Sequence, residues 1–456
     1  MLGIVREWSV YFVLLCVASS PPVWTAVASA EEPLEPDPVV QAEEVVVSAT
    51  KTPLPVSQVT SAVEVITSQD MKKQNIRNVA DALRLAQGLA VFSNGGPGTE
   101  VNARIRGGSS SQTLVLIDGA IVNSGTLGSY NFANLTTDNI ERVEVLRGAQ
   151  SMLWGSDAMG GVINIVTKRG QGPLSATGFM EYGSFASLRE GGMVSGKQGA
   201  VDYSFSLSRW DTSSFSAVNY RRGAGERDSY RNWQGSGRIG VDLPKDGRLD
   251  FTMRWMNSDV QLDSVSATSP SDVYGSKNRS QEYVFSGSYE QPLTGWWSQK
   301  LTLARAQEAS QFLPGTLQRS LITGAFSTPF GTPNEIRVLS NRLEWQHNFQ
   351  ITKLLLLSAG YQFREQQGEN DTGLTNRILS SNAGFAQAQF NLWDRLFATA
   401  GIRHDSYNVF GDATTYRLTG GYLHKETDTK IRGSYSTGFR APTMNELYFP
   451  NFGNSQ

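Results

Sequence analysis

From residue 170 onward, the chain repeats segments of about ten residues in which apolar and polar side chains alternate. In 249–255, for example, Phe251, Met253 and Trp255 alternate with polar residues. Alternation with a period of two predicts β-strands that have one apolar and one polar face. Thirteen such segments are present, at 174–183, 188–198, 201–211, 232–243, 248–258, 281–291, 297–308, 337–349, 352–366, 381–392, 396–407, 415–424 and 429–438.

The connections between these segments alternate in length, and this alternation indicates the architecture. Every second connection is short, at 196–199, 244–247, 292–295, 350–352, 393–395 and 425–429. The others are mostly long and polar, at 212–231, 259–280, 309–336 and 367–380. Short turns at one end and long loops at the other are typical of a transmembrane antiparallel β-barrel, whose long loops face the outside. The alternative is a secreted β-sandwich or β-propeller, in which so regular an alternation is not expected.

Composition argues against several functional classes. The 456 residues carry 40 Lys and Arg against 42 Asp and Glu, a net charge of −2, which argues against a basic nucleic-acid-binding protein. One cysteine, Cys16, and three histidines cannot form a Cys₂His₂ zinc site or a disulfide framework. The sequence contains no catalytic constellation, so we expect a protein that is not an enzyme.

The N-terminal region has the features of an export signal followed by a flexible leader. An apolar core at 10–17 is too short to span a bilayer as a helix, and an A-x-A pattern at 28–30 fits a cleavage site, so 1–30 is assigned to a signal peptide. Residues 31–53 form the leader, which contains a β-prone run at 43–49. That run is either an ordinary edge strand or a strand offered to a partner by β-augmentation.

Residues 54–169 are predicted to form a small mixed α/β domain ahead of the barrel domain at 170–456. Helices are expected to start near Ser68, the predicted N-cap, and at 78–85. Glycines concentrate between the elements, where they permit turns with positive φ. The strands are predicted at 62–66, 114–117, 140–146 and 162–166.

Motifs in this domain follow one another as they do in a known family. They are Ile105-Arg106-Gly107, Leu116-Ile117-Asp118-Gly119, IERVEVLRG at 140–148 and WGSDAMGGVINI at 154–165. With 438–448, they resemble the TonB-dependent outer-membrane receptors, and within them the vitamin B12 (cobalamin) transporter and siderophore receptor group. The resemblance implies an N-terminal α/β plug domain in a barrel of roughly 22 strands, in the outer membrane of a Gram-negative bacterium. Thirteen strands would then be an incomplete barrel, and we expect a C-terminally truncated chain.

The resemblance also implies roles for individual residues. The TonB box, which pairs with TonB and through it with the ExbB/ExbD energy complex, corresponds to Glu44, Val45, Val46, Val47, Ser48 and Ala49. Arg106 and Arg147 match plug arginines that lock onto barrel glutamates. The substrate-binding plug apices correspond to Asn94, Gly95, Gly96, Asn123, Ser129 and Tyr130. We expect a monomer surrounded by outer-membrane lipid and lipopolysaccharide, with no nucleic-acid partner.

The function implied by the resemblance is active uptake of a scarce large nutrient. Cobalamin or a related corrinoid is the first candidate and a ferric siderophore the alternative; a passive porin or adhesin is the alternative of a different class. The outer loops are also candidates for a structural Ca²⁺, because carboxylates in loops supply the oxygen ligands that this ion prefers. The candidate ligands are Asp211, Asp228, Asp259 and Asp263, with solvated loop acids as the alternative interpretation. No other cofactor is expected.

Overall fold

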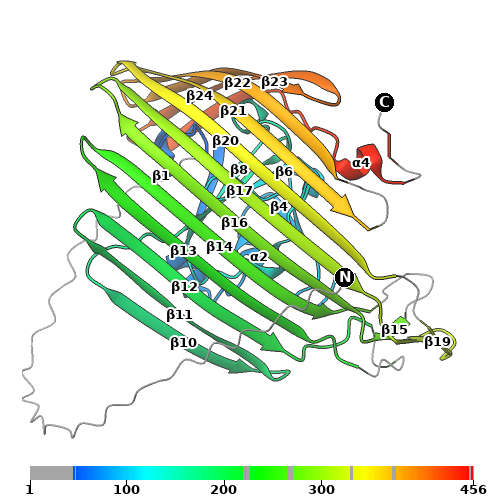
Figure 1. Cartoon of the computed structure of the whole chain (residues 1–456). Helices are drawn as coiled ribbons and strands as arrows, with labels where there is room; N and C mark the ends of the chain where they lie inside the picture. The colour runs from blue at the N-terminus through cyan, green and yellow to red at the C-terminus, as the bar shows by residue number, and fades with distance from the viewer. Residues whose placement is uncertain are drawn as a thin grey trace, which may run out of the picture. The chain divides into compact units, whose positions relative to one another are not determined.

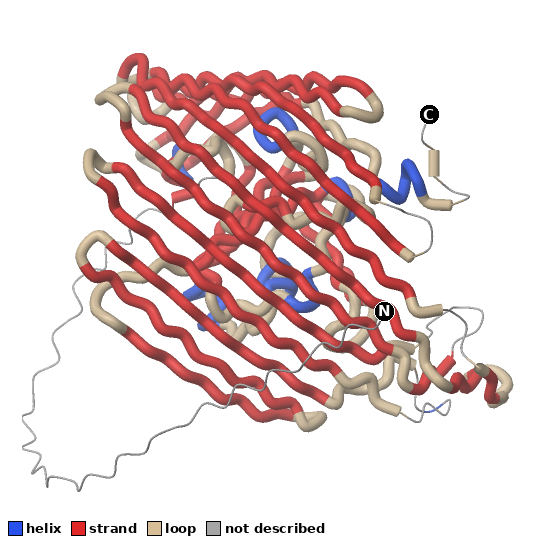
Figure 2. The backbone as a smooth tube through the Cα atoms, in the orientation of Figure 1, coloured by secondary structure: helices blue, strands red, loops and turns tan. Residues whose placement is uncertain are grey.

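The computed structural model describes residues 45–46, 48–218, 221, 226–263, 271–328, 332–371, 376–450 and 453–454. The predicted signal peptide, most of the leader including Glu44, and Val47 lie outside this part of the chain. Strands account for most of the described residues, and the few helices are short (Figure 2). None of the helices in the described ranges combines the length and apolar character that a membrane-spanning helix needs.

Thirteen antiparallel strands form one continuous sheet, here called the barrel sheet, in which each strand pairs with the next along the chain (Figure 1). All thirteen predicted strand segments are confirmed. The strands are β10 (Ser175–Gly183), β11 (Ser187–Gln198), β12 (Val201–Thr212), β13 (Tyr230–Leu243), β14 (Gly247–Gln261), β16 (Lys277–Pro292), β17 (Trp297–Leu313), β20 (Asn334–Thr352), β21 (Leu355–Asn370), β22 (Arg377–Leu392), β23 (Leu396–Tyr407), β24 (Gly411–His424) and β25 (Thr429–Ser436).

Several strands extend beyond the predicted segments at the end of the sheet that carries the long connections, the long-loop end. β17 was predicted to end near residue 308 and continues to Leu313. The first extra residues, 309–311, are small or polar, and the apolar Phe312 and Leu313 follow one another, so the extension carries no apolar alternation. Beyond this end, β15 (Ser271–Tyr274), β18 (Leu317–Ser320) and β19 (Phe326–Ser327) form a small loop sheet that the sequence did not predict.

The two faces of the barrel sheet differ as the alternation predicts. In β13, Asn232 and Gln234 are buried against the plug, whereas Arg231 points away from it. On the outward face, Phe205, Phe251 and Leu303 remain about half exposed. Large apolar side chains that no protein covers are suited to contact with lipid.

The plug domain is built on a five-stranded sheet with the order β3-β8-β9-β6-β7. Only the β6–β9 pairing is parallel; the others are antiparallel. Side chains from both faces of this sheet are buried, so β6 (TLVLI) is a continuous apolar run rather than an alternating one. The strands are β3 (Ala62–Thr67), β6 (Thr113–Ile117), β7 (Ala120–Ile121), β8 (Ile140–Arg147) and β9 (Gly161–Thr167).

The remaining plug elements are short. They are the hairpin β4 (Leu89–Ser93) and β5 (Val101–Ile105), helices α1 (Ser68–Lys73), α2 (Val79–Leu83) and α3 (Ser151–Trp154), and the 3₁₀ turns η1 (Val56–Gln58), η2 (Ser110–Gln112) and η3 (Phe132–Asn134). The predicted cap of α1 was wrong by one residue: Thr67, not Ser68, is the N-cap. Thr67 Oγ1 accepts from Asp70 N at 3.2 Å, and the Asp70 carboxylate accepts from Thr67 N at 3.0 Å, which forms a capping box.

Candidate functional site

Residues 48–52, which begin with the last two residues of the predicted TonB box, form a buried segment that we call the docked segment. All five residues are less than a tenth exposed. Four consecutive backbone carbonyls accept hydrogen bonds from four different side chains. The donors are Trp154 Nε1 to Ser48 O (2.9 Å), Arg417 NH1 to Ala49 O (3.3 Å), Gln387 Nε2 to Thr50 O (3.2 Å) and Gln346 Nε2 to Lys51 O (3.4 Å). Three donors lie on barrel strands β24, β22 and β20, so the barrel sheet holds this segment through its backbone.

Lys51 anchors the docked segment by a buried ion pair. Its Nζ lies 2.6 Å from Glu344 Oε2, and it also lies over the rings of Trp154 (4.8 Å) and Phe385 (4.2 Å). Burial lowers the pKa of Lys51 to about 7, although the charge of Glu344 favours the ammonium form. Arg342 bonds to the same Glu344, so two buried cations share one barrel carboxylate.

Glu144 in β8 is the plug partner of the docked segment. This fully buried carboxylate accepts from Ser48 N (3.1 Å) and Ser48 Oγ (2.5 Å). It also accepts from Asn164 Nδ2 at 3.2 Å and Arg142 Nε at 2.9 Å. Because these last two bonds do not involve the docked segment, Glu144 keeps partners when Ser48 leaves, which lowers the cost of release.

The described part of the predicted TonB box is folded back on the chain. β1 (Val45–Val46) pairs antiparallel with β2 (Leu54–Pro55), and Val46, Ser48 and Ala49 are fully buried. Glu44 and Val47 lie outside the described residues. A strand of another protein can therefore pair with this region only after it has separated from β2. The pairing of 44–49 with TonB stays a prediction.

Neither predicted lock arginine contacts a barrel glutamate within the described ranges. Arg106 is exposed, and Arg147 lies 3.3 Å from Glu64 and donates to Gln87 O, both in the plug. Their pairing with barrel glutamates therefore stays a prediction.

The observed contacts instead run mainly from barrel cations to plug oxygens, which the sequence reasoning missed. Arg342 NH1 donates to Gly119 O at 2.6 Å, and Arg417 NH1 to Gln150 Oε1 at 2.6 Å. Arg238 NH1 donates to Thr167 O at 3.2 Å. These arginines occupy positions of the alternation that face the plug, and a lumenal cation needs such partners. Their position in the alternation was the signal that could have identified them.

The first predicted plug apex, at 94–98, lies against the connection that follows β12. The space beside Gly96 is closed by Ser214 and Phe215, and a Cβ there would lie 2.9 Å from Ser214 Oγ. Gly98 has φ +83°, and a Cβ at this position would lie 2.2 Å from the ring of Tyr230. Gly95 is exposed. The backbone of Asn94, also exposed, donates to Glu100 O at 3.0 Å. This apex therefore needs glycine where a buried aromatic ring closes on the backbone.

Among the predicted residues of the second apex, Asn123 has a structural role. Its side chain accepts from Val115 N (2.7 Å) and donates to Thr113 O (2.9 Å) and Gly128 O (2.8 Å). Both amide protons are thus used to hold the loop 123–130 in place. Asn123, Ser129 and Tyr130 all line a recess beside that loop, but the hydrogen-bonding groups of the Asn123 side chain are already used by the plug backbone.

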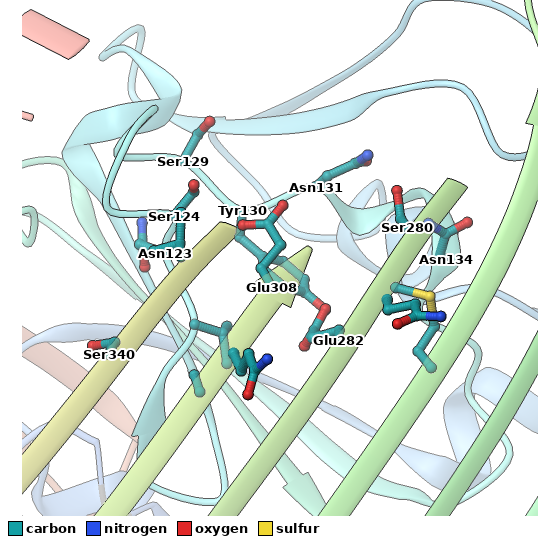
Figure 3. Close-up of a pocket in the computed structure, with 16 residues that line it drawn as sticks. Asn123, Ser124, Ser129, Tyr130, Asn131, Asn134, Ser280, Glu282, Glu308 and Ser340 are labelled. Atoms are coloured by element: carbon teal, nitrogen blue, oxygen red, sulfur yellow. The ribbon is translucent and has the colours of Figure 1, made fainter. Parts of the chain in front are cut away.

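This apical recess has a volume of about 40 Å³ and lies between the loop 123–130 and strands β16, β17 and β20 (Figure 3). Glu282 and Glu308 face it from directly opposite positions on β16 and β17. Tyr130 donates its hydroxyl to Glu282, at 3.2 and 3.4 Å from the two carboxylate oxygens. The neighbouring Arg254 in β14 donates to Gln234, and among the described residues it forms no ion pair with either carboxylate. The recess therefore offers hydrogen-bond acceptors to a group that carries donors or positive charge.

An acidic loop cluster lies in the long connections. Ligand oxygens of Glu226, Asp263 and Asp272 lie within 4.8 Å of one another, and Asp228 is coupled electrostatically to Asp263 and Glu226. Burial, reinforced by the neighbouring carboxylates, raises the pKa of Glu226 and of Asp228 to about 7. One oxygen of each of these two residues is buried and has no hydrogen-bond partner among the described residues. Such a set of oxygens matches the ligand preference of Ca²⁺.

Two of the four predicted calcium ligands belong to this cluster and two do not. Asp228 and Asp263 are part of it, together with Glu226 and Asp272, which the sequence reasoning missed. Asp211 instead pairs with Arg231 at 2.7 Å, and Asp259 with Arg279 at 3.2 Å, on the outward face of the barrel sheet. The sequence spacing of the acids could not distinguish a loop position from the end of a strand.

The α/β plug is bound to the polar face of a large antiparallel sheet, and the other face of that sheet is apolar and exposed. These features together define a plugged outer-membrane β-barrel protein. Residues 55–162 match the TonB-dependent receptor plug domain, and residues 202–456 match the TonB-dependent receptor-like β-barrel. The chain belongs to the TonB-dependent receptor family, whose members reside in the Gram-negative outer membrane.

The relatives of this chain fall into two groups. The chain is 27% identical over 414 residues to the vitamin B12 transporter BtuB of Photobacterium profundum, and 27% identical over 420 residues to that of Vibrio vulnificus. Each alignment covers 90% of this chain and 64% of the relative, so the chain spans less than two thirds of their length. Two solved siderophore receptors share the fold at low sequence identity. They are PirA of Acinetobacter baumannii (TM-score 0.67, 20% identity, 84% of this chain and 62% of that one) and the ferripyoverdine receptor of Pseudomonas aeruginosa (TM-score 0.69, 17% identity, 88% and 59%).

Proposed function

We propose that the protein is a TonB-dependent importer of cobalamin or a related corrinoid. The sequence similarity to vitamin B12 transporters extends over 90% of the chain. The observation that carries the choice of ligand is the apical recess, where Glu282 and Glu308 present acceptors beside the plug apex. A corrinoid carries primary amides on its periphery, whose N–H groups complement such acceptors.

The alternative ligand is a ferric siderophore, which the fold similarity to siderophore receptors favours. Many ferric siderophore complexes are anionic, and the recess presents oxygen acceptors rather than a cation to such a complex. The recess therefore supports the corrinoid over an anionic iron complex.

In this proposal, uptake is driven by TonB, energised by ExbB/ExbD, which pulls on residues 44–49. The docked segment holds that region in the closed state through Lys51, Glu344 and the four captured carbonyls. A passive porin or adhesin does not depend on an energy-transducing partner, so it would not need a releasable segment of this kind. The protein accordingly acts as a transporter and performs no catalysis.

Ligand identity is tested by titrating the full-length receptor in detergent with cyanocobalamin and, separately, with ferric enterobactin. We expect cyanocobalamin to bind with a Kd of about 1 μM or tighter, and ferric enterobactin not to bind in that range. Tight binding of the iron complex without binding of cyanocobalamin would overturn the proposal.

Energy coupling is tested in cells by deleting residues 44–49. The matched control deletes 35–40, six leader residues outside the TonB box. Uptake of cyanocobalamin should be abolished by the first deletion and retained by the second. Uptake that persists without 44–49 would instead indicate a passive porin.

We also propose that the acidic loop cluster binds Ca²⁺ through Glu226, Asp228, Asp263 and Asp272. Both raised pKa values mean that protons occupy Glu226 and Asp228 below about pH 7, and calcium must displace them. Without calcium, repulsion among the carboxylates is fully present above pH 7 and is relieved as they are protonated below it. The stabilisation by calcium therefore grows as the pH rises.

Isothermal titration with CaCl₂ is expected to show an affinity at least about tenfold weaker at pH 5.5 than at pH 8, because protons compete for the ligands. Asp263→Asn should abolish binding at both values. The control Asp259→Asn, on an acid that pairs with Arg279 instead, should leave it unchanged. Equal loss in both variants, or an affinity independent of pH, would contradict this site.

A further inference from the structure

The chain that follows β25 lies along the plug and leads into a short helix, α4 (Met444–Tyr448) (Figure 1). We call residues 438–447 the strap, and the proposed function assigns no role to them. The first contacts of the strap with the plug are Phe439 N to Ser151 Oγ (3.0 Å) and Ala441 N to Ser156 Oγ (2.8 Å). The strap is therefore bonded to the plug before the helix begins.

The N-terminus of α4 is bonded to the backbone of the loop 123–130, which borders the apical recess. Met444 N donates to Gly125 O at 3.0 Å, and Asn445 N donates to Thr126 O at 3.4 Å. The first N–H groups of a helix have no partner within the helix, and here the plug loop supplies acceptors for two of them. Because both acceptors are main-chain carbonyls, the strap holds the loop without using the side chains that face the recess.

Glu446 fixes the geometry of the strap at this point. Its carboxylate accepts from Arg440 NH1 and NH2, both at 2.7 Å, and from Thr443 N at 2.8 Å. Glu446 N in turn donates to Thr443 Oγ1 at 3.2 Å, which completes a capping box. The bidentate pair with Arg440 closes the strap on itself. The start of α4 is thus held with its remaining N–H groups directed at the loop.

The other side of α4 is packed on the barrel sheet. Met444 and Leu447 are buried together with Leu379 of β22, and the guanidinium carbon of Arg377 lies 4.6 Å from the centre of the Tyr448 ring. A helix of five residues is too short to be stable alone, so this packing is what keeps it formed. α4 therefore joins the long-loop end of β22 to the plug loop.

We propose that the strap holds the loop 123–130 in its ligand-binding position through the backbone N–H groups of Met444 and Asn445. The strap acts through the loop, so Met444 and Asn445 are positioning residues. This inference rests on the proposed function, in which Ser129 and Tyr130 of the same loop line the recess that takes the ligand. A loop that is ordered in advance loses less conformational entropy when the ligand binds.

The test replaces Met444 by proline. Met444 is the first residue of α4, where proline is tolerated, and Thr443 before it is extended (φ −77°, ψ 165°), as a residue that precedes proline should be. The change removes the N–H that donates to Gly125 O, and this buried carbonyl regains a partner only when the loop moves toward water. The matched control Met444→Ala removes more of the buried side chain but keeps the N–H.

Two quantities are measured on the receptor in detergent. They are the mobility of a nitroxide at Leu127→Cys, an exposed position in the loop, by electron paramagnetic resonance, and the Kd for cyanocobalamin in the unlabelled protein. Met444→Pro should make the label mobile and weaken cyanocobalamin binding about fivefold, the equivalent of one lost backbone hydrogen bond. Met444→Ala should lower the thermal stability but leave the label immobile and the Kd unchanged.

Folding of each variant is verified by heat modifiability on electrophoresis. Glu446→Ala removes the carboxylate that braces the strap and changes an exposed residue, so it decides the question if Met444→Pro does not fold. It should also make the label mobile. An immobile label in both variants, or equal mobility in Met444→Pro and Met444→Ala, would overturn the inference. If the wild-type receptor does not bind cyanocobalamin, the proposed function fails, and the label still reports whether the strap holds the loop.

Discussion

Replacement of Glu344 by glutamine is expected to release the docked segment. The change leaves Lys51 and Arg342 buried without their shared counter-charge, and an uncompensated buried charge costs about 3–5 kcal/mol. Below pH 7, where Lys51 carries its proton, the free energy that holds residues 48–52 should fall by about that amount, since leaving the site restores water to the Lys51 ammonium. The remaining contacts are the four captured carbonyls, at about 1 kcal/mol each, and the bonds of Ser48 to Glu144, and none of them supplies a counter-charge to Lys51.

The measurement is electron paramagnetic resonance of a nitroxide at Pro53→Cys, an exposed position next to the docked segment. Labelling is specific, because the only cysteine, Cys16, lies in the predicted signal peptide. Glu344→Gln should convert the immobile spectrum to a mobile one. Glu426→Gln breaks the exposed pair with Arg395 at the short-turn end and serves as the control. An immobile label in Glu344→Gln would show that the ion pair does not hold the segment.

Gly98→Ala is expected to detach the first plug apex and to destabilise the protein by about 3 kcal/mol. Two effects add: a residue with φ +83° must tolerate a Cβ, and that Cβ would overlap the ring of Tyr230 at 2.2 Å. The ring cannot give way freely, because Tyr230 is 2% exposed and its hydroxyl donates to Asn134 Oδ1 at 3.0 Å. The apex should move instead, and ligand affinity should fall with it.

Gly107→Ala separates the two effects. Gly107 has φ +77°, close to that of Gly98, but no atom lies within 4 Å of an added Cβ. Gly107→Ala should therefore lower the free energy of unfolding only by the conformational penalty, about 1 kcal/mol. Thermal unfolding and cyanocobalamin titration of both variants give the comparison. Equal effects of the two substitutions would mean that the contact with Tyr230 contributes nothing.

The barrel strands could be predicted because their physical signal is local and repetitive. Phe251, Met253 and Trp255 face lipid and alternate with residues that face the plug, so the pattern does not depend on any distant contact. The same reasoning failed at the strand ends and for β15, β18 and β19, where pairing occurs between polar loops. In these segments, strand formation is determined by pairing with neighbouring loops and not by the intrinsic β-propensity of the residues.

The candidate site was only partly predictable, since its contacts join residues that are far apart in the chain. Lys51 and Glu344 are separated by 293 positions, and nothing in the sequence around either indicates the other. The family resemblance directed attention to Arg106 and Arg147, whereas the described contacts use Arg342 and Arg417. The alternation of the strands already placed those two arginines on the inward face.

The carbonyl contacts of the docked segment follow one another along the chain, one per residue from 48 to 51. Tension applied from the N-terminal side therefore loads them in series, and they break one after another rather than together. The bonds of Ser48 to Glu144 and Trp154 break first, then the single carbonyl bonds of Ala49 and Thr50, until the load reaches the Lys51–Glu344 pair at the far end of the row. A brief pull detaches residues 48–50, which then bind again when the tension ends. A sustained pull also separates Lys51 from Glu344 and releases the whole docked segment.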